Sequence, residues 1–246
     1  MCVLFPALIF TMGIAKHPAD ISYRGFPALY PTNYLADKAA SHRLILIGTH
    51  HKNPQVHNII IDALPLLAHD SGINTIFMEI PSDQQHAIDL FARGMAPVES
   101  IGMWDIIASG TYYDILLKAR DLGLKIVAID KPKALYTSRD RWMGNKVCRH
   151  LDADPDAKGI IIVGARHVFK DIKWINLDDP SLADYLHGRD IFSVIMWPKA
   201  IETTLPIAID ISPSIFKGVK DPILTAMNTM PNVSLATTAD GVILMP

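Results

Sequence analysis

The chain has few cysteines and no concentration of positive charge. Its two cysteines, Cys2 and Cys148, lie far apart and neither belongs to a CxxC motif, which excludes a disulfide framework and a thiolate zinc site. The formal net charge is -2 and no dense stripe of lysine and arginine is present, so the charge gives no reason to expect nucleic acid as a partner. Imidazole and carboxylate ligands remain available from 10 histidines and 25 acidic residues.

Long apolar runs are also absent, and none reaches the length that crosses a bilayer. The uncharged stretch 1–15 is too short for a membrane span, and no Lys or Arg precedes it. Three interpretations stay open: a trimmed secretory signal, a truncated start, or an apolar arm packed on the domain. A signal would make the protein exported or periplasmic, and without one we expect it in the cytoplasm. We expect no integral membrane segment.

No internal repeat of 20–50 residues is visible. The 246 residues suffice for one large α/β domain or two small ones, and half of them are hydrophobic, as in a well-cored globular protein. We divide the chain into an apolar N-terminal segment and lead-in over residues 1–40 and a single α/β domain over residues 41–246.

Short β-branched runs alternate with longer helical segments from about residue 43, a pattern typical of βα units on a mostly parallel sheet. The first strands are expected at 44–47, 75–78, 125–129 and 159–163. They are continuously apolar, as strands covered on both faces are. Beyond residue 167 several prolines interrupt three further strand-like runs, 191–196, 205–210 and 241–245. The fold class is therefore α/β, a central mostly parallel sheet flanked by helices, with an irregular strand-containing C-terminal extension that has room for antiparallel pairs.

Four helical segments are expected between the strands, at 54–70, 82–94, 97–123 (one helix or two) and 138–152. Pro65 should kink or split the first of them. Ser82 or Asp83 is expected to cap the second, and Ser138 the last.

Polar residues follow the ends of four of these strands, where ligands bind in open α/β sheets. Two Gly-X-X-His turns, 48–51 and 164–167, follow the first and fourth strands, while Glu79 and Asp130 end the second and third. A glycine after a strand allows a sharp turn that points the later histidine over the sheet edge. His51, Glu79 and His167 together would suit zinc, manganese or cobalt, which could activate a bound water.

A site without metal is equally sound chemically. A histidine oriented by a carboxylate can act as a general base, and an arginine can stabilise an oxyanion. Arg139 shares a helix face with Met143 and Val147, so we expect it to point inward and to need a carboxylate such as Glu79 or Asp130. Set beside this are the structural interpretations, in which Glu79 caps a helix or pairs with Arg139 and Asp130 belongs to a turn.

These residues resemble a known superfamily, which joins the TraB/PrgY and Tiki proteins with the EreA/ChaN-like proteins. The resemblance rests on five motifs in order: the Gly-Thr-X-His at 48–51, the His-X-Asn-Pro at 51–54, Glu79, the Arg-Asp-X-X-Met at 139–143, and the second Gly-X-X-His at 164–167. ChaN and esterase members usually carry Glu directly after the first glycine, where this chain has Thr49. That departure favours the Tiki-like pattern.

The resemblance implies a site formed by His51, Glu79, Arg139 and His167. It leads to the hypothesis of a hydrolase of peptide or ester bonds that acts on a peptide or small molecule, with His51, Glu79 and His167 holding a divalent metal.

Two alternatives remain. One is a haem- or ligand-binding protein without turnover, in which His50, Tyr112 or Tyr113 would contact the cofactor. The other is a catalytically inactive relative.

Overall fold

The protein was analysed as a computed structural model that describes residues 22–23, 25–133, 135, 138–174, 179–197, 204–217, 219, 224 and 233–246. The stretch 1–15, for which the sequence left three interpretations open, lies outside these residues. Among the residues described, no helix is both long enough and apolar enough to cross a membrane.

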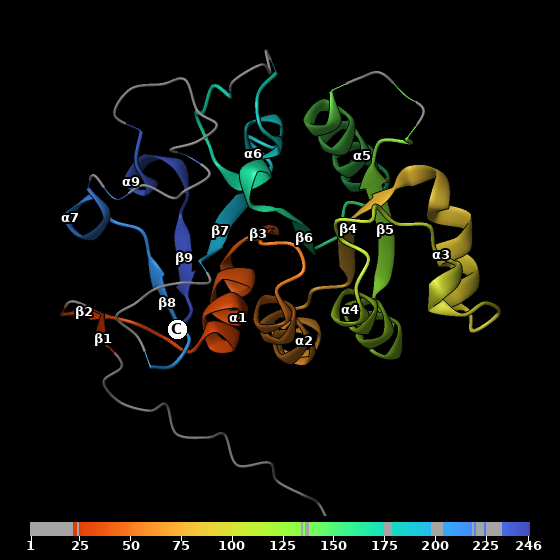
Figure 1. Cartoon of the computed structure of the whole chain (residues 1–246), viewed down its shortest axis with the longest axis horizontal. Helices are drawn as coiled ribbons and strands as arrows, with labels where there is room; N and C mark the ends of the chain where they lie inside the picture. Colours follow the sequence, from red (N-terminus) through yellow and green to blue (C-terminus); the bar gives the residue numbers. More distant parts are fainter. Residues whose placement is uncertain are drawn as a thin grey trace, which may run out of the picture.

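A seven-stranded sheet forms the centre of the molecule (Figure 1). Its strands are β3 (Leu44–Thr49), β4 (Thr75–Pro81), β5 (Lys125–Asp130), β6 (Gly159–Gly164), β7 (Ile191–Trp197), β8 (Ile207–Asp210) and β9 (Gly241–Leu244). They lie in the order β5-β4-β6-β3-β7-β9-β8, and every neighbouring pair is parallel except β8 and β9. All residues of β3, β4, β6 and β9 are buried, because helices cover both faces. The predicted α/β fold and its antiparallel extension are confirmed.

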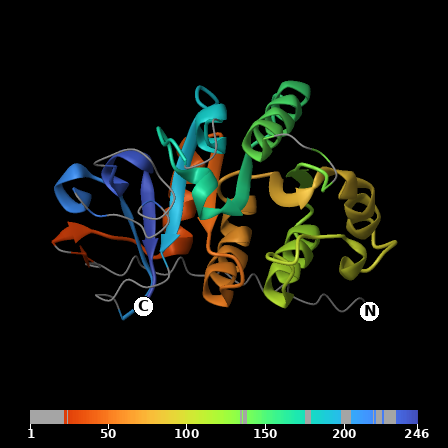
Figure 2. The same cartoon turned by 45° about the horizontal axis from the view of Figure 1, so that its top comes forward.

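Helices form a layer on each face of the sheet. One face carries α1 (Pro31–Ser41), α2 (Pro54–His69), α3 (Gln85–Ala92) and α4 (Gly110–Asp121). The other carries α5 (Arg139–Ala153) and the short helices α6 (Leu182–Tyr185), α7 (Pro213–Phe216) and α9 (Leu235–Thr238). Figures 1 and 2 both show α2 and α4 on the side opposite α5. The sheet thus separates two hydrophobic cores, and its strand ends lie between the helix layers.

The N-terminal part of the described chain contacts the edge of the sheet formed by β8. A two-stranded sheet of β1 (Ser22–Tyr23) and β2 (Phe26–Pro27) precedes α1. Leu29 then makes an antiparallel bridge to Ala208 of β8, and α1 buries Leu35 and Ala39 in the core. Part of the predicted lead-in, residues 31–40, is therefore packed against the sheet.

Several local predictions need correction. The helix α2 runs unbroken through Pro65, so the predicted split is wrong: buried residues on both sides of the proline, such as Leu64 and Leu67, hold the helix by packing. Neither Ser82 nor Asp83 caps α3, because a 3-10 turn, η1 (Ser82–Gln84), comes first and no side-chain cap forms.

The segment 97–123 contains the 3-10 turn η2 (Val98–Ser100), a loop and α4. Ser138 does cap α5, since its side chain accepts a hydrogen bond from the Arg141 N–H.

Candidate active site at the carboxyl edge of the sheet

The two Gly-X-X-His turns lie side by side. Strands β3 and β6 are neighbours, and Thr49 is paired in register with Gly164. Each strand is followed at once by its histidine turn, the second of which forms the 3-10 turn η3 (Ala165–Val168). Strand β4, which contains Glu79, adjoins β6, and β5, which ends at Asp130, adjoins β4. The strand order therefore brings the predicted residues to one edge of the sheet.

Arg139 joins the carboxylates of this edge. Its Nη2 donates to Glu79 Oε1 at 2.5 Å and to Asp130 Oδ2 at 2.6 Å, while its Nε donates to Asp130 Oδ1 at 3.1 Å. The two acidic side chains are 2% and 0% exposed, and that of Arg139 is 31% exposed. Burial acts to lower the pKa of Arg139, but Asp130 and Glu79 outweigh it and raise that pKa. The inward orientation predicted for Arg139 is confirmed, and it binds both carboxylates rather than one.

Trp104 extends this cluster. Its indole N–H donates to Asp130 Oδ2 at 2.6 Å, and the Arg139 guanidinium carbon lies 5.6 Å from the centre of its ring. Asp130 thus accepts from an arginine, an indole and the Lys131 N–H. The sequence does not predict this contact, because nothing in the spacing of Trp104 indicates a residue 26 positions away.

His167 is fully buried between two carboxylates. Its Nδ1 is hydrogen-bonded to Asp140 Oδ1, and its Nε2 lies 3.8 Å from Glu79 Oε1. A carboxylate on Nδ1 fixes the tautomer of the neutral ring with the proton on Nδ1, so that Nε2 is the acceptor. In the sequence, Asp140 appears only as the second residue of the Arg-Asp-X-X-Met motif, with no role of its own. Its helical spacing from Met143 and Val147, which face the sheet, could have predicted that it also points inward.

His51 lies against the backbone of Gly164. A Cβ placed on that glycine would be 2.7 Å from His51 Nε2, so no larger residue leaves room for the imidazole. The Gly164 N–H donates to Glu79 Oε2 at 2.6 Å. Burial lowers the pKa of His51 against the opposing effect of the Glu79 carboxylate, and the positive charge of Arg139 lowers it further. His51 is therefore a neutral, half-buried imidazole at neutral pH.

Comparison with known proteins gives structural neighbours only. No family model and no curated protein sequence matches the chain. The structure resembles that of an erythromycin esterase mutant, EreC H289N, with a TM-score of 0.62 and 12% identity over 87% of this chain and 93% of that one. ChaN of Campylobacter jejuni, solved with cofacial haem, matches with a TM-score of 0.51 and 9% identity over 86% and 90%. The type III effector HopBA1 matches with a TM-score of 0.58 and 14% identity over 94% and 99%.

These matches span nearly the whole of both chains. The chain has the fold of EreC and ChaN. Thr49, directly after the first glycine, donates its hydroxyl to the Val163 carbonyl at 3.1 Å. The narrower resemblance to the TraB/PrgY and Tiki proteins stays a prediction.

The predicted metal ligands do not fit a metal ion as they are arranged in this structure. Across the described parts, no group of three or more His, Cys, Asp or Glu side chains is placed to hold one. Glu79 is already engaged on both oxygens, by Arg139 on Oε1 and by the Gly164 N–H on Oε2. His51, Glu79 and His167 come together, with His167 Nε2 3.8 Å from Glu79 Oε1 and His51 within the electrostatic influence of both.

The residues predicted to contact a cofactor differ in their access to solvent. Tyr112 is 2% exposed and packs edge-on against His57, with ring centres 5.7 Å apart. It therefore has no surface position from which to bind haem, which corrects that prediction. Its place in the core follows from the buried face of α4, which it shares with Leu116 and Ala119. His50 and Tyr113 are half-buried, and their role stays a prediction.

Proposed function

We propose that the protein is a hydrolase of ester or peptide bonds in which His51 is the general base for an attacking water. The observation that carries this proposal is a neutral imidazole, accessible from solvent, held beside a buried carboxylate. Depression of its pKa by burial keeps His51 able to accept a proton at neutral pH, and Glu79 stabilises the imidazolium that forms.

Arg139 supplies the positive charge that such a reaction needs. Its hydrogen bonds to Glu79 and Asp130 use Nε and Nη2, and in the described part of the chain Nη1 makes no hydrogen bond to another residue. A partly exposed guanidinium fixed by two buried carboxylates is a preorganised donor for a developing oxyanion. Water would add to the carbonyl as its proton passes to His51. The C–O or C–N bond would then break as that proton passes to the leaving group.

The remaining polar residues serve as support. Asp140 orients His167, whose Nε2 lies 3.8 Å from Glu79 Oε1, and neither Asp140 nor His167 is exposed enough to meet a substrate directly. Ester and peptide bonds both form a tetrahedral anion when water attacks, so the proposal includes both. The resemblance of the fold to an erythromycin esterase supports the ester more directly.

The test is hydrolysis of p-nitrophenyl esters and of quenched fluorescent peptides by the purified chain, with and without EDTA. We expect turnover that EDTA does not change, and a loss of about 10²- to 10⁴-fold in kcat in His51→Ala. His42→Ala is the matched control, because His42 lies two residues before β3, at the end of the strand away from His51. Full activity in His51→Ala would refute the proposal. Loss of activity in EDTA with recovery in zinc would support the metal-bound mechanism in its place.

A second candidate function is ligand binding without turnover. It is favoured by the fold shared with haem-bound ChaN, and the residues left for it are His50 and Tyr113. Titration of the protein with haem tests it. A Soret band that shifts in His50→Ala or Tyr113→Phe would support this function, and an unchanged spectrum of free haem would remove it.

A further inference from the structure

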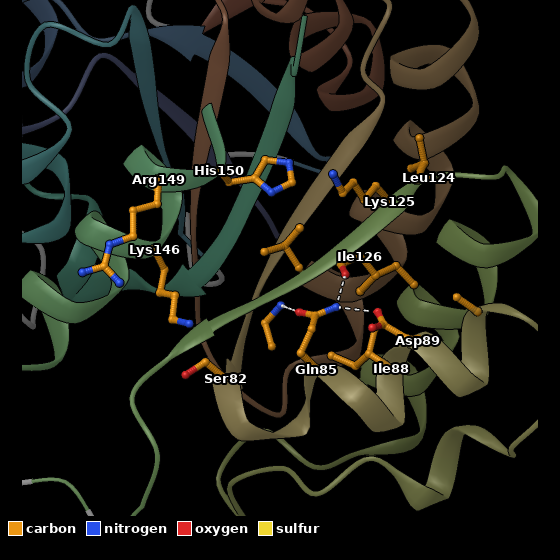
Figure 3. Close-up of a pocket in the computed structure, with 13 residues that line it drawn as sticks. Ser82, Gln85, Ile88, Asp89, Leu124, Lys125, Ile126, Lys146, Arg149 and His150 are labelled. Carbon is orange, nitrogen blue, oxygen red and sulfur yellow. Dashed lines mark hydrogen bonds between the residues drawn. The ribbon is translucent and has the colours of Figure 1, made fainter. Parts of the chain in front are cut away.

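A groove runs along the open edge of the sheet, away from the candidate active site. Strand β5 is the last strand on this side, and the groove of about 510 Å³ lies beside it between α3 and α5 (Figure 3). These two helices cover opposite faces of the sheet. The floor of the groove is thus the unpaired edge of a strand, and each wall is a helix.

The edge already binds an amide group in this groove. The Gln85 side chain donates from Nε2 to the Ile126 carbonyl at 3.0 Å and accepts on Oε1 from the Ala128 N–H at 2.8 Å. Figure 3 shows the Gln85 amide directed at the strand. A carbonyl and an N–H two residues apart are the groups that a neighbouring parallel strand would use. Gln85 therefore occupies part of the position of an added strand, and protects this edge from pairing.

The two walls of the groove differ in chemistry. The α5 wall and the start of β5 contribute Lys146, Arg149, His150 and Lys125, whereas the α3 wall contributes Ile88, Ala92 and Asp89. Asp89 is engaged, because its Oδ1 accepts from Gln85 Nε2 at 2.9 Å. In Figure 3 Lys146 extends toward Ser82, and Lys125 faces His150. Asp154 Oδ2 lies 3.8 Å from Lys125 Nζ, but Lys146 and Arg149 add to the same wall, so a chain of net charge -2 has a wall with an excess of positive charge at this edge.

Because side chains alternate along a strand, the difference between the two walls predicts which residues an added strand would carry. Ile126 and Ala128 belong to the core on the α3 side, and Val127 to the core on the α5 side. Side chains of an added strand would alternate in the same way. Those on one side would meet Lys125 and Lys146, and those on the other would meet Ile88 and Ile126.

We propose that the edge of β5 binds an extended peptide segment of a partner protein, in which acidic and apolar residues alternate. The peptide pairs with the backbone of residues 124–128, in place of the Gln85 amide. Strand addition supplies main-chain hydrogen bonds, and the two walls select the side chains. A second copy of this chain fits poorly, because pairing two β5 edges would bring Lys125, Lys146 and Arg149 against their own kind.

The experiment measures fluorescence anisotropy of a capped, labelled six-residue peptide of alternating glutamate and valine. We expect saturable binding that weakens about fivefold in Lys125→Gln/Lys146→Gln. Gln85→Ala should bind roughly tenfold more tightly, because two hydrogen bonds no longer have to be broken first. Lys217→Gln is the matched control, since Lys217 is exposed and follows α7 at the far end of the molecule (Figure 1).

Two control peptides make the result decisive. The same peptide with alternate backbone nitrogens methylated should not bind, and a lysine–valine peptide should bind at least tenfold more weakly. Equal binding of the methylated peptide would overturn strand addition in favour of a simple anion site. A dimer of the chain that Gln85→Ala strengthens would assign the edge to a second copy instead. Absence of binding to both wild type and Gln85→Ala, with thermal unfolding showing both folded, would also overturn the proposal.

Discussion

Two arginines in the first turn of α5 have very different surroundings. Arg139 points between the helix layers and binds two carboxylates that are 2% and 0% exposed. Arg141, two residues later, points outward and binds Asp179 at 2.7 Å, with side chains 58% and 30% exposed. The spacing alone sends the two side chains in different directions. An arginine–carboxylate pair on the buried side of this helix turn therefore differs in its effect on stability from such a pair on the exposed side.

The difference lies in what remains when one partner is removed. A buried charge left without its partner is strongly unfavourable, whereas an exposed one is simply hydrated. The buried cluster of Arg139, Glu79 and Asp130, here the inner cluster, therefore constrains the structure. The exposed pair of Arg141 and Asp179, here the outer pair, contributes little to stability.

The largest expected effect comes from breaking the inner cluster. In Glu79→Ala, Arg139 loses one of its two carboxylates and the Gly164 N–H loses its acceptor, and we expect a loss of about 3–5 kcal/mol in the free energy of unfolding. Asp179→Ala, the matched change at Arg141, should cost no more than about 1 kcal/mol. Urea denaturation of both variants measures the difference. Equal losses would show that burial does not distinguish the two arginines.

His57, a buried residue of α2, should make the stability of the protein depend on pH. Burial, and then the charge of His51, lower the pKa of His57 to about 4 from 6.5. The unfolded chain therefore takes up a proton below pH 6.5 that the folded protein refuses until about pH 4, so stability falls as pH falls through this window. The shift corresponds to about 3 kcal/mol.

His57→Gln should flatten this part of the profile, measured as the free energy of unfolding from pH 7 to pH 4. His69→Gln on the same helix controls for the loss of an exposed imidazole. An unchanged slope in His57→Gln would contradict the assignment.

A smaller effect is expected at Gly164. Its φ is in the extended region, so the backbone tolerates alanine, but the new Cβ would lie 2.7 Å from His51 Nε2. The imidazole must move, and we expect a loss of about 1–3 kcal/mol in the free energy of unfolding. The displaced His51 should also lower the hydrolytic activity of the protein that remains folded. Gly110→Ala is the control, because nothing lies within 4 Å of a Cβ there. Activity retained in Gly164→Ala would show that His51 is not held as described.

The smallest effect is expected at the outer pair itself. A double-mutant cycle on Arg141 and Asp179 should give a coupling of about 0.2–1 kcal/mol that decreases as salt is added. A coupling that exceeds that of Arg139 with Glu79 would reverse the comparison.

Much of this arrangement follows from local sequence patterns. The apolar run 159–163 predicts a strand covered on both faces, and the helical spacing of Arg139 with Met143 and Val147 predicts an inward arginine. Such patterns assign residues to faces and strand ends. They do not specify partners across the sheet, so Trp104 beside Asp130 and Asp140 beside His167 appear only in three dimensions.

The metal prediction shows the same limit. Sequence spacing brought His51, Glu79 and His167 to one edge, but it could not show which groups the Glu79 oxygens face. The Gly164 N–H takes one of them and Arg139 the other. The edge of β5 shows the same limit. The sequence contains an apolar run with Gln85 upstream, but it does not show that the Gln85 side chain hydrogen-bonds to the free edge of this strand.

Gly164 also sets a condition for anyone who would move this site into another protein. The glycine contributes no side chain, yet its N–H orients Glu79 and its missing Cβ leaves the space for His51. Grafting the four polar side chains onto a different α/β scaffold would therefore reproduce the residue types without their geometry. A successful transplant needs the end of β6 itself, with a bare Cα facing the end of β3.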